Sequence, residues 1–159
     1  MTSSGDRGKL DDVSRQIVAL LQVDGRASYA SIGKAVGLSE AAVRSRVQKL
    51  TESGVMQVVA VTDPLEMGFA RQAMIGIRAS GPLEPLAAAL AELPEVIYVV
   101  ITAGSFDLLI EVICESDQHL LEVVSSRLRS RDDVASTETF LYLKLQKQTY
   151  AWGLPSDQR

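Results

Sequence analysis

Apolar residues recur with a helical period through the first third of the chain. Between Asp11 and Gly54 they predict three short helices, the first two followed closely by Gly25 and Gly37. Only a very short turn separates the second helix from the third, whose apolar stripe is backed by polar and basic residues. This arrangement is typical of helix-turn-helix proteins, in which the second helix of the motif enters the major groove of DNA.

Polar residues before the predicted helices are suited to cap them. Asp11 or Asp12 can cap the first helix, because a carboxylate accepts hydrogen bonds from the free N–H groups of a first turn. Ser28 and Ser39 can cap the second and third helices in the same way. Gly33 lies inside the second helix, where glycine costs about 1 kcal/mol against alanine, and we expect it to permit a close approach of two helices.

The candidate DNA contacts are the polar residues of this motif. Arginine and glutamine can make bidentate contacts to guanine and adenine, whereas serine and lysine more often contact phosphates. We expect DNA contacts among Ser28, Tyr29, Ser31, Ser39, Glu40, Arg44, Ser45, Arg46, Gln48 and Lys49. For Ser28 a simple helix cap is the stronger explanation, and a basic face is also common on helical hairpins that bind nothing.

The remainder of the chain alternates strands and helices. The predicted elements are a strand or wing over 57–62, a strand over 72–79, a helix from Pro82, strands over 96–102 and 106–114, a helix from Ser116 or Asp117, and a strand over about 134–148. From residue 72 the order is β-α-β-β-α-β, which predicts a ferredoxin-like domain: a four-stranded antiparallel sheet with two helices on one face.

These elements predict an α+β protein with two domains. The expected division is a disordered lead-in at 1–9, a winged helix-turn-helix domain at 10–62, a linker at 63–71, a ferredoxin-like domain at 72–150 and a tail at 151–159. In the last strand Phe140 and Tyr142 alternate with Leu141 and Leu143, so both faces of the sheet carry apolar residues. Because helices cover only one face, we expect the other to join two copies in a homodimer.

Charge and composition restrict the function. Residues 1–60 hold 8 Lys/Arg and 6 Asp/Glu, a net +2, whereas residues 61–159 hold 8 and 14, a net −6. This asymmetry fits a nucleic-acid-binding first domain and an acidic second one. Cys114 is the only cysteine, which excludes an intrachain disulfide. Without a signal peptide or a long apolar run, the chain is expected to be cytoplasmic and not to bind a membrane.

The chain resembles the Lrp/AsnC (feast/famine) transcriptional regulators from about Leu10 to about Tyr150. The resemblance is carried by LDDVSRQIVALLQVDGRAS, IGKAVGLS, VRSRVQKLTESGV, VVAVTDPLEMG, LPEVIYVVITAGSFDLLIEV and DVASTETFLYLK, in this order. It implies an N-terminal domain that binds double-stranded operator DNA and a C-terminal ferredoxin-like domain of the RAM type. It also implies dimers that assemble to octamers or larger discs, regulated by a small amino acid or related metabolite. No cofactor is expected, and the residues offer no metal-binding cluster.

By the same resemblance, the turn after the second strand corresponds to the effector-site loop of the family. Independently, a glycine turn exposes backbone N–H groups that can bind a carboxylate, and Asp107 offers a partner for an ammonium group. The expected effector contacts are Val100, Thr102, Ala103, Gly104, Ser105, Phe106, Asp107, Thr137, Glu138 and Thr139. The family often has an acidic residue where this chain has Ser105, so the identity of the effector cannot be transferred. Alternatively, Gly104 only makes a hairpin turn.

Two other classes of function remain as alternatives. Sirohaem decarboxylases share this two-domain form, so the fold is compatible with an enzyme. However, His119 is the only histidine, and its helical position beside Leu120 favours a surface residue over a catalyst. The third class is a metabolite sensor that does not bind DNA, against which Arg44, Arg46 and Lys49 on one helix argue.

Overall fold

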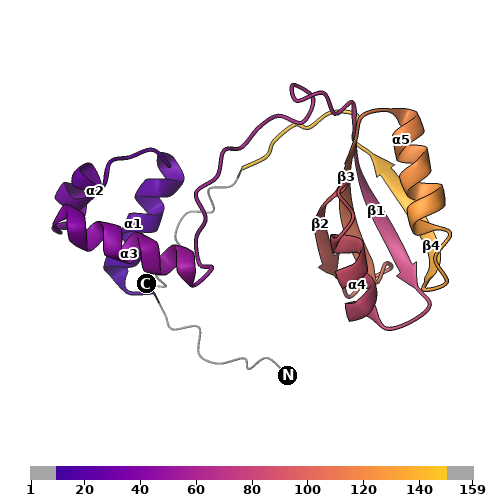
Figure 1. Cartoon of the computed structure of the whole chain (residues 1–159), viewed down its shortest axis with the longest axis horizontal. Helices are drawn as coiled ribbons and strands as arrows, with labels where there is room; N and C mark the ends of the chain where they lie inside the picture. Colours follow the sequence, from indigo (N-terminus) through magenta and orange to yellow (C-terminus); the bar gives the residue numbers. More distant parts are fainter. Residues whose placement is uncertain (1–9, 150–159) are drawn as a thin grey trace. The chain divides into compact units, whose positions relative to one another are not determined.

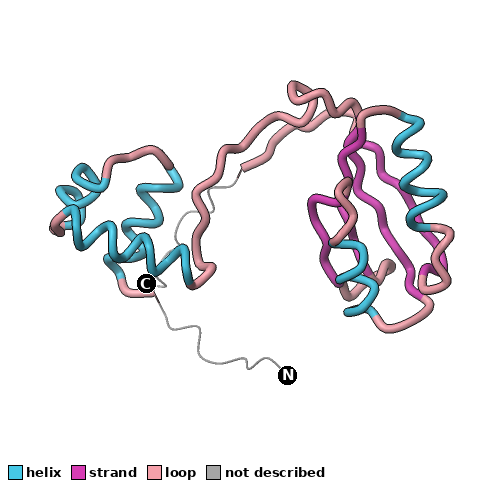
Figure 2. Tube along the Cα trace, viewed as in Figure 1, coloured by secondary structure: helices cyan, strands magenta, loops and turns pink. Residues whose placement is uncertain are grey.

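A computed structural model of the chain describes residues 10–149, which form two compact units (Figures 1 and 2). Of the described residues, the first contains 10–60 and 147–149, and Val61–Gln146 make up the second. The lead-in expected at 1–9 and the tail expected at 151–159 lie outside the described residues.

The first unit is a three-helix domain, as the sequence predicts. Its helices are α1 (Asp12–Val23), α2 (Tyr29–Val36) and α3 (Glu40–Glu52). Asp11 caps α1 by accepting a hydrogen bond of 2.7 Å from the Ser14 N–H. The buried apolar residues of the three helices form one core, which contains Ile17, Leu21, Ile32, Val43 and Val47. Each helix is too short to be stable alone, so this shared core fixes the orientation of α3.

The turn between α2 and α3 depends on two glycines. Gly37 has a φ of 72°, the left-handed conformation that ends a helix. The Leu38 N–H reaches back to the Gly33 carbonyl at 2.9 Å. A Cβ at Gly33 would lie only 2.5 Å from the Leu38 carbonyl oxygen. Gly33 is therefore needed by this turn, a more local reason than the predicted approach of two helices.

The second unit has the predicted ferredoxin-like fold. Its strands are β1 (Arg71–Ala79), β2 (Val96–Ile101), β3 (Leu108–Cys114) and β4 (Val134–Leu141). They form an antiparallel sheet in the order β2-β3-β1-β4. Helices α4 (Leu83–Ala91) and α5 (Asp117–Glu122), the latter continued by a π-helix, η1 (Val123–Leu128), belong to this unit. One core joins the sheet to α4 and η1 and contains Ala73, Ile75, Ile77, Leu86, Leu90, Leu108, Ile110, Val112, Cys114, Val123, Leu128 and Val134.

Strand alternation gives the sheet two distinct faces. On β1, Ala73, Ile75 and Ile77 are buried toward the helices, so Met74, Gly76 and Arg78 belong to the opposite, open face. Cross-strand pairing extends the open face to Phe140, opposite Met74. These residues define the open face of the sheet.

The open face is less apolar than the sequence predicts. The Gln72 side chain donates a hydrogen bond of 2.8 Å to the Glu111 carboxylate, and both lie on this face. Burial and the neighbouring charge of Glu111 raise the pKa of Tyr142 to about 12. Phe140, by contrast, is 43% exposed. The face therefore combines a polar group with exposed aromatic surface.

One predicted strand is absent, and another is shorter than expected. Gln57–Thr62 form no strand, so the wing is not present in the described chain. β4 ends at Leu141 instead of 148, and Leu143 is 92% exposed. Pairing continues only as far as the Tyr142 N–H, which donates to the Gln72 carbonyl at 2.9 Å, because β1, the partner of β4, begins at Arg71 and offers nothing to pair with the residues farther along.

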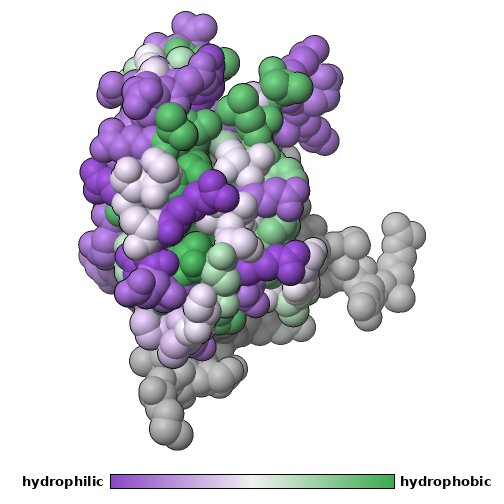
Figure 3. All heavy atoms as spheres, turned by 90° about the vertical axis from the view of Figure 1, so that its right-hand side faces the viewer, coloured by the Kyte–Doolittle hydropathy of each residue, from purple (hydrophilic) through white to green (hydrophobic). Residues whose placement is uncertain are grey.

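The second predicted helix of this unit changes its winding. From Val123 it is a π-helix, and the Arg129 N–H bonds the Val124 carbonyl five residues earlier at 3.0 Å. Val123 and Leu128 of this π-helix are buried, whereas Leu121 of α5 is 58% exposed. Figure 3 views the molecule from the right-hand side of Figure 1 and shows hydrophobic and hydrophilic residues intermixed there. None of the described helices is long and apolar enough to span a membrane.

Candidate DNA-binding and effector sites

Helix α3 presents a polar surface opposite its buried stripe. Val43, Val47 and Leu50 are buried, whereas Arg44, Ser45, Gln48 and Lys49 are exposed. Two of these exposed residues have partners on the same helix: Arg44 donates to Glu40 at 2.8 Å, and Gln48 donates to Glu52 at 2.8 Å. Such exposed pairs contribute little to stability, so both side chains can exchange them for DNA.

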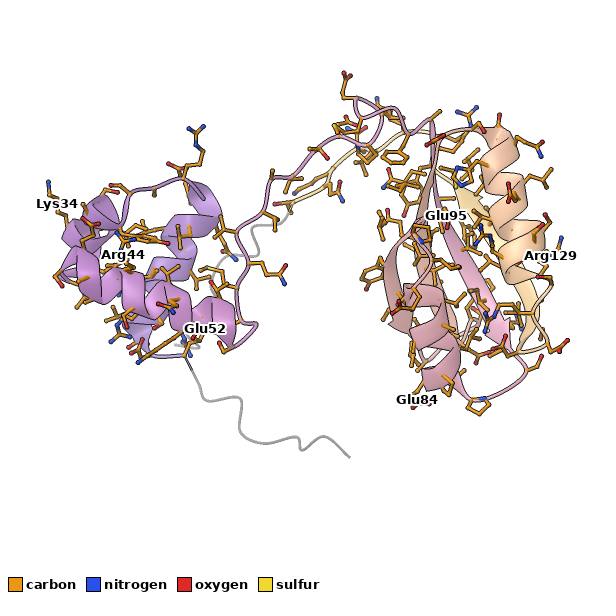
Figure 4. All side chains as sticks on the ribbon, viewed as in Figure 1. Lys34, Arg44, Glu52, Glu84, Glu95 and Arg129 are labelled. Atoms are coloured by element: carbon orange, nitrogen blue, oxygen red, sulfur yellow. The ribbon has the colours of Figure 1, made fainter. Side chains whose placement is uncertain are left out.

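Arg44 also connects α3 to α2. Its guanidinium lies 5.1 Å from the centre of the Tyr29 ring, and its side chain is 62% exposed. Figure 4 shows Arg44 on α3 and Lys34 on the neighbouring helix α2. Stacking on Tyr29 reduces the freedom of the Arg44 side chain and leaves the guanidinium accessible to a DNA groove.

Arg46 has a different environment, although the sequence placed it with Arg44. Its Nη1 donates to the Asp11 carboxylate at 2.6 Å and to the Ser14 hydroxyl at 3.0 Å. Hydrogen bonds, first from Arg46 and then from Ser14, lower the pKa of Asp11 to about 2. This contact is complete above about pH 4 and is lost as the pH falls toward 2. Arg46 therefore ties α3 to the start of α1.

Two of the predicted serines, Ser28 and Ser39, act first as helix caps, and a third, Ser31, is bonded to Ser28. The Ser28 hydroxyl accepts from the Ser31 N–H at 3.1 Å, and the Ser39 hydroxyl accepts from the Ala42 N–H at 3.2 Å. The Ser31 hydroxyl in turn donates to the Ser28 carbonyl at 2.8 Å. These bonds account for the three serines without DNA, and their contacts to phosphate stay a prediction.

Arg44→Ala and Arg46→Ala are expected to weaken DNA binding for different reasons. A bidentate base contact contributes about 1–3 kcal/mol, so Arg44→Ala should lower operator affinity by roughly 5- to 150-fold at unchanged Tm. Arg46→Ala should mainly lower the Tm of the helical domain. Affinity by fluorescence anisotropy and Tm by circular dichroism distinguish the two effects.

Asp11→Asn is the matched control for the role of Arg46. It weakens the same contact from the other side without touching α3, so it should reproduce the loss of Tm. Tight DNA binding by Arg44→Ala would move recognition away from this residue. An unchanged Tm in both Arg46→Ala and Asp11→Asn would contradict the structural role of the contact.

The loop between β2 and β3 is held at both ends and free in the middle. The Thr102 N–H donates to the Asp107 carbonyl at 2.8 Å, and the Thr102 hydroxyl donates to the Phe106 carbonyl at 2.5 Å. In the described part of the chain, none of the backbone N–H groups of residues 103–106 donates a hydrogen bond. These N–H groups, including that of Gly104, can therefore bind an anion.

Asp107 is bonded to the protein itself. Its carboxylate accepts a hydrogen bond of 2.8 Å from the Ala79 N–H, and its own N–H donates to the Ile77 carbonyl at 2.9 Å. The residue thus fixes the end of β1 to the loop. Because one carboxylate oxygen is occupied, Asp107 is a less available partner for an ammonium group than the sequence suggested.

Phe106 carries the loop onto the open face. A Cβ at Gly76 would lie 2.7 Å from the Phe106 ring, so the ring rests directly on the bare backbone of β1. It meets Phe140 edge to face with 6.1 Å between the ring centres. The Arg78 guanidinium lies 5.5 Å from the centre of the same ring. Arg78 was not among the predicted site residues, because only the fold brings it to the loop.

The other predicted effector residues do not share one face. Glu138 is opposite Gly76 on the open face, whereas Thr137 and Thr139 are opposite Ile77 and Ile75. These three consecutive residues therefore do not share one face of the strand. Val100 is opposite Leu109 and lies on the open face. Ala103 and Ser105 are exposed in the loop. Whether each binds an effector stays a prediction.

His119 is built into the second domain. Its Nε2 lies 3.3 Å from the Glu95 carboxylate, and its Nδ1 lies 3.4 Å from the Glu115 N–H. Glu95 lies in the interior, between the strands and α5 (Figure 4). Burial tends to raise the pKa of Glu95, but hydrogen bonds from its own backbone and His119 and the charge of Arg127 outweigh burial and lower it. His119 is therefore held by partners within the domain, and Cys114 is buried.

Comparison with known proteins agrees with this architecture. Residues 10–51 match the model of the AsnC-type helix-turn-helix domain, and residues 72–152 match that of the Lrp/AsnC ligand binding domain. The HTH-type transcriptional regulator FL11 of Pyrococcus furiosus is 32% identical over 145 residues, covering 90% of this chain and 95% of FL11.

Solved structures give the same result. That of AsnC from Escherichia coli has a TM-score of 0.76 and 28% identity, covering 89% of this chain and 97% of AsnC. The complex of the regulator NMB0573 from Neisseria meningitidis with L-Met has a TM-score of 0.79 and 25% identity, covering 94% of this chain and 98% of the other.

The fold and the two domains define a transcriptional regulator with a helix-turn-helix DNA-binding domain and a ligand-binding domain. The chain belongs to the Lrp/AsnC family. The predicted family and fold class are thereby confirmed.

Proposed function

We propose that this regulator binds operator DNA through α3 and responds to an amino acid or related small metabolite bound at the loop of residues 102–107. The observation that carries the proposal is this loop, whose backbone N–H groups are unoccupied within the described chain and whose Phe106 packs on the sheet. The L-Met complex of a similar regulator supports an amino acid as effector. The division into a DNA-binding domain at 10–62 and an effector domain at 72–150 belongs to this proposal.

We further propose a homodimer that assembles to octamers or larger forms in the cytoplasm. The support is the open face, with its exposed Phe140, and the segments that precede β1 and follow β4 in the chain and form no strand. In those segments the apolar side chains of Val58, Val59 and Leu143 are more than half exposed. Exposed apolar residues that lie together often mark a surface for another protein chain. A dimer would place two copies of α3 on one operator. It would also double the small excess of basic over acidic residues in the DNA-binding domain. We propose action by binding and not by catalysis, since the named relatives are regulators.

Effector binding is tested by measuring the Tm of the whole chain with each standard amino acid and the matching 2-oxo acid. A ligand that binds only the native state raises the free energy of unfolding and therefore the Tm. At a ligand concentration of 100 times the Kd, the gain in unfolding free energy is about 2.7 kcal/mol. A positive compound should then change either the oligomer size in sedimentation or the operator affinity. If a saturating ligand changed neither, regulation by this loop would be rejected, and DNA binding would remain as the function.

A further inference from the structure

We propose that Arg78 binds the carboxylate of the effector, together with the free backbone N–H groups of residues 103–106. The inference rests on the proposed function, because it concerns the same loop. It adds one side chain to the proposed site and predicts that binding requires the negative charge of the carboxylate of the ligand.

Arg78 has no carboxylate partner in the described chain. Its side chain is exposed, and among the described residues it forms no ion pair. By comparison, Arg71 is bound to Asp117, and Arg131 is bound to Asp133. Residues 61–159 carry 8 Lys/Arg against 14 Asp/Glu, and the Arg78 guanidinium is not neutralised by any of these carboxylates in an ion pair within the described chain.

The Arg78 guanidinium lies 5.5 Å from the centre of the Phe106 ring, and Phe106 belongs to the loop with the free N–H groups. Stacking on a ring orients the guanidinium plane and leaves its N–H edge available for a bidentate contact with a carboxylate. The ring itself is fixed by Gly76 and Phe140. The cation is therefore held beside the loop before any ligand arrives.

The carboxylates near the loop do not form an ion pair with Arg78 in the described chain. Asp107 uses one oxygen to accept from the Ala79 N–H, and Ser105 carries no charge. Glu138 lies opposite Gly76 on the same face but forms no ion pair with Arg78 in the described structure. Arg78 and the free N–H groups are thus donors at this end of the open face, and their natural ligand is an anion of the size of a carboxylate.

The test compares the whole chain with its Arg78→Met variant, which keeps the apolar stem and removes the charge. The probes are the standard amino acids, their carboxamides and the matching 2-oxo acids, with Tm as the first readout and calorimetry for the Kd of any positive compound. Arg129→Met is the matched control, because it removes another exposed arginine of the same domain, at the end of η1.

The expected result has three parts. The unmodified chain responds to carboxylates and not to their carboxamides, Arg78→Met weakens binding by about tenfold or more, and Arg129→Met binds normally. A response to 2-oxo acids alone, again lost in Arg78→Met, would confirm the role of Arg78 while rejecting an amino acid as effector. An effector that binds Arg78→Met with unchanged Kd, or a chain that responds to none of the carboxylates, would overturn the inference.

Discussion

Gly33→Ala should destabilise the helical domain and remove most of its DNA binding. The new Cβ, fixed to the backbone of α2, would lie 2.5 Å from the Leu38 carbonyl oxygen, which belongs to the backbone of the short turn. Since no side-chain rotation relieves this contact, the turn must open, and α3 must shift with it. Overpacking of this kind costs about 1–3 kcal/mol, and each kcal/mol lowers the Tm of a small domain by roughly 4–8 °C.

Gly25→Ala is the matched control in the same domain. Its Cβ would meet the Leu21 carbonyl at 3.7 Å, an ordinary contact, so stability and operator affinity should be nearly unchanged. Thermal melts by circular dichroism and anisotropy titrations with operator DNA measure both effects. If Gly33→Ala melted and bound DNA like Gly25→Ala, the turn would be more adaptable than its geometry indicates, and the orientation of α3 would depend on the core alone.

The helix-turn-helix could be predicted because its signals are local. Ser28, Gly37 and Ser39 act within three or four residues of their own positions, as caps and as a left-handed stop. Such interactions are readable from spacing. The different roles of Arg44 and Arg46 could not be predicted, because the Asp11 partner of Arg46 is 35 residues away in the chain. Only the packing of α1 against α3 brings them together.

The predicted end of β4 was wrong for a related reason. Alternating apolar residues continue beyond Leu141, so the sequence alone favours a longer β4. A strand also needs a hydrogen-bonding partner, and β1 offers one only from Arg71. Strand pairing also explains why Arg78 was missing from the predicted site. Its stacking on Phe106 requires the pairing of β1 with β3, which spacing along the chain does not show.

Gly76→Ala should uncouple the effector loop from the sheet. The added methyl group would occupy space now filled by the Phe106 ring, 2.7 Å away, and the nearest atoms include the root of the ring. Phe106 must therefore leave its contacts with Phe140 and Arg78. We expect a loss of about 1–3 kcal/mol in the stability of the second domain and loss of the Tm response to effector. Operator binding by the unliganded chain should persist.

Gly104→Ala separates the effect on the loop from the effect on the fold. A Cβ there would meet no other atom within 4 Å, and Gly104 is not among the glycines with positive φ in the described chain. The chain itself thus has no need for glycine at this position, and the unliganded Tm should not change. If a ligand approaches the backbone here, the methyl group should still weaken effector binding measured by calorimetry. Normal effector binding by both Gly76→Ala and Gly104→Ala would place the effector elsewhere on the domain, because neither the position of Phe106 nor the bare backbone of the loop would then be required.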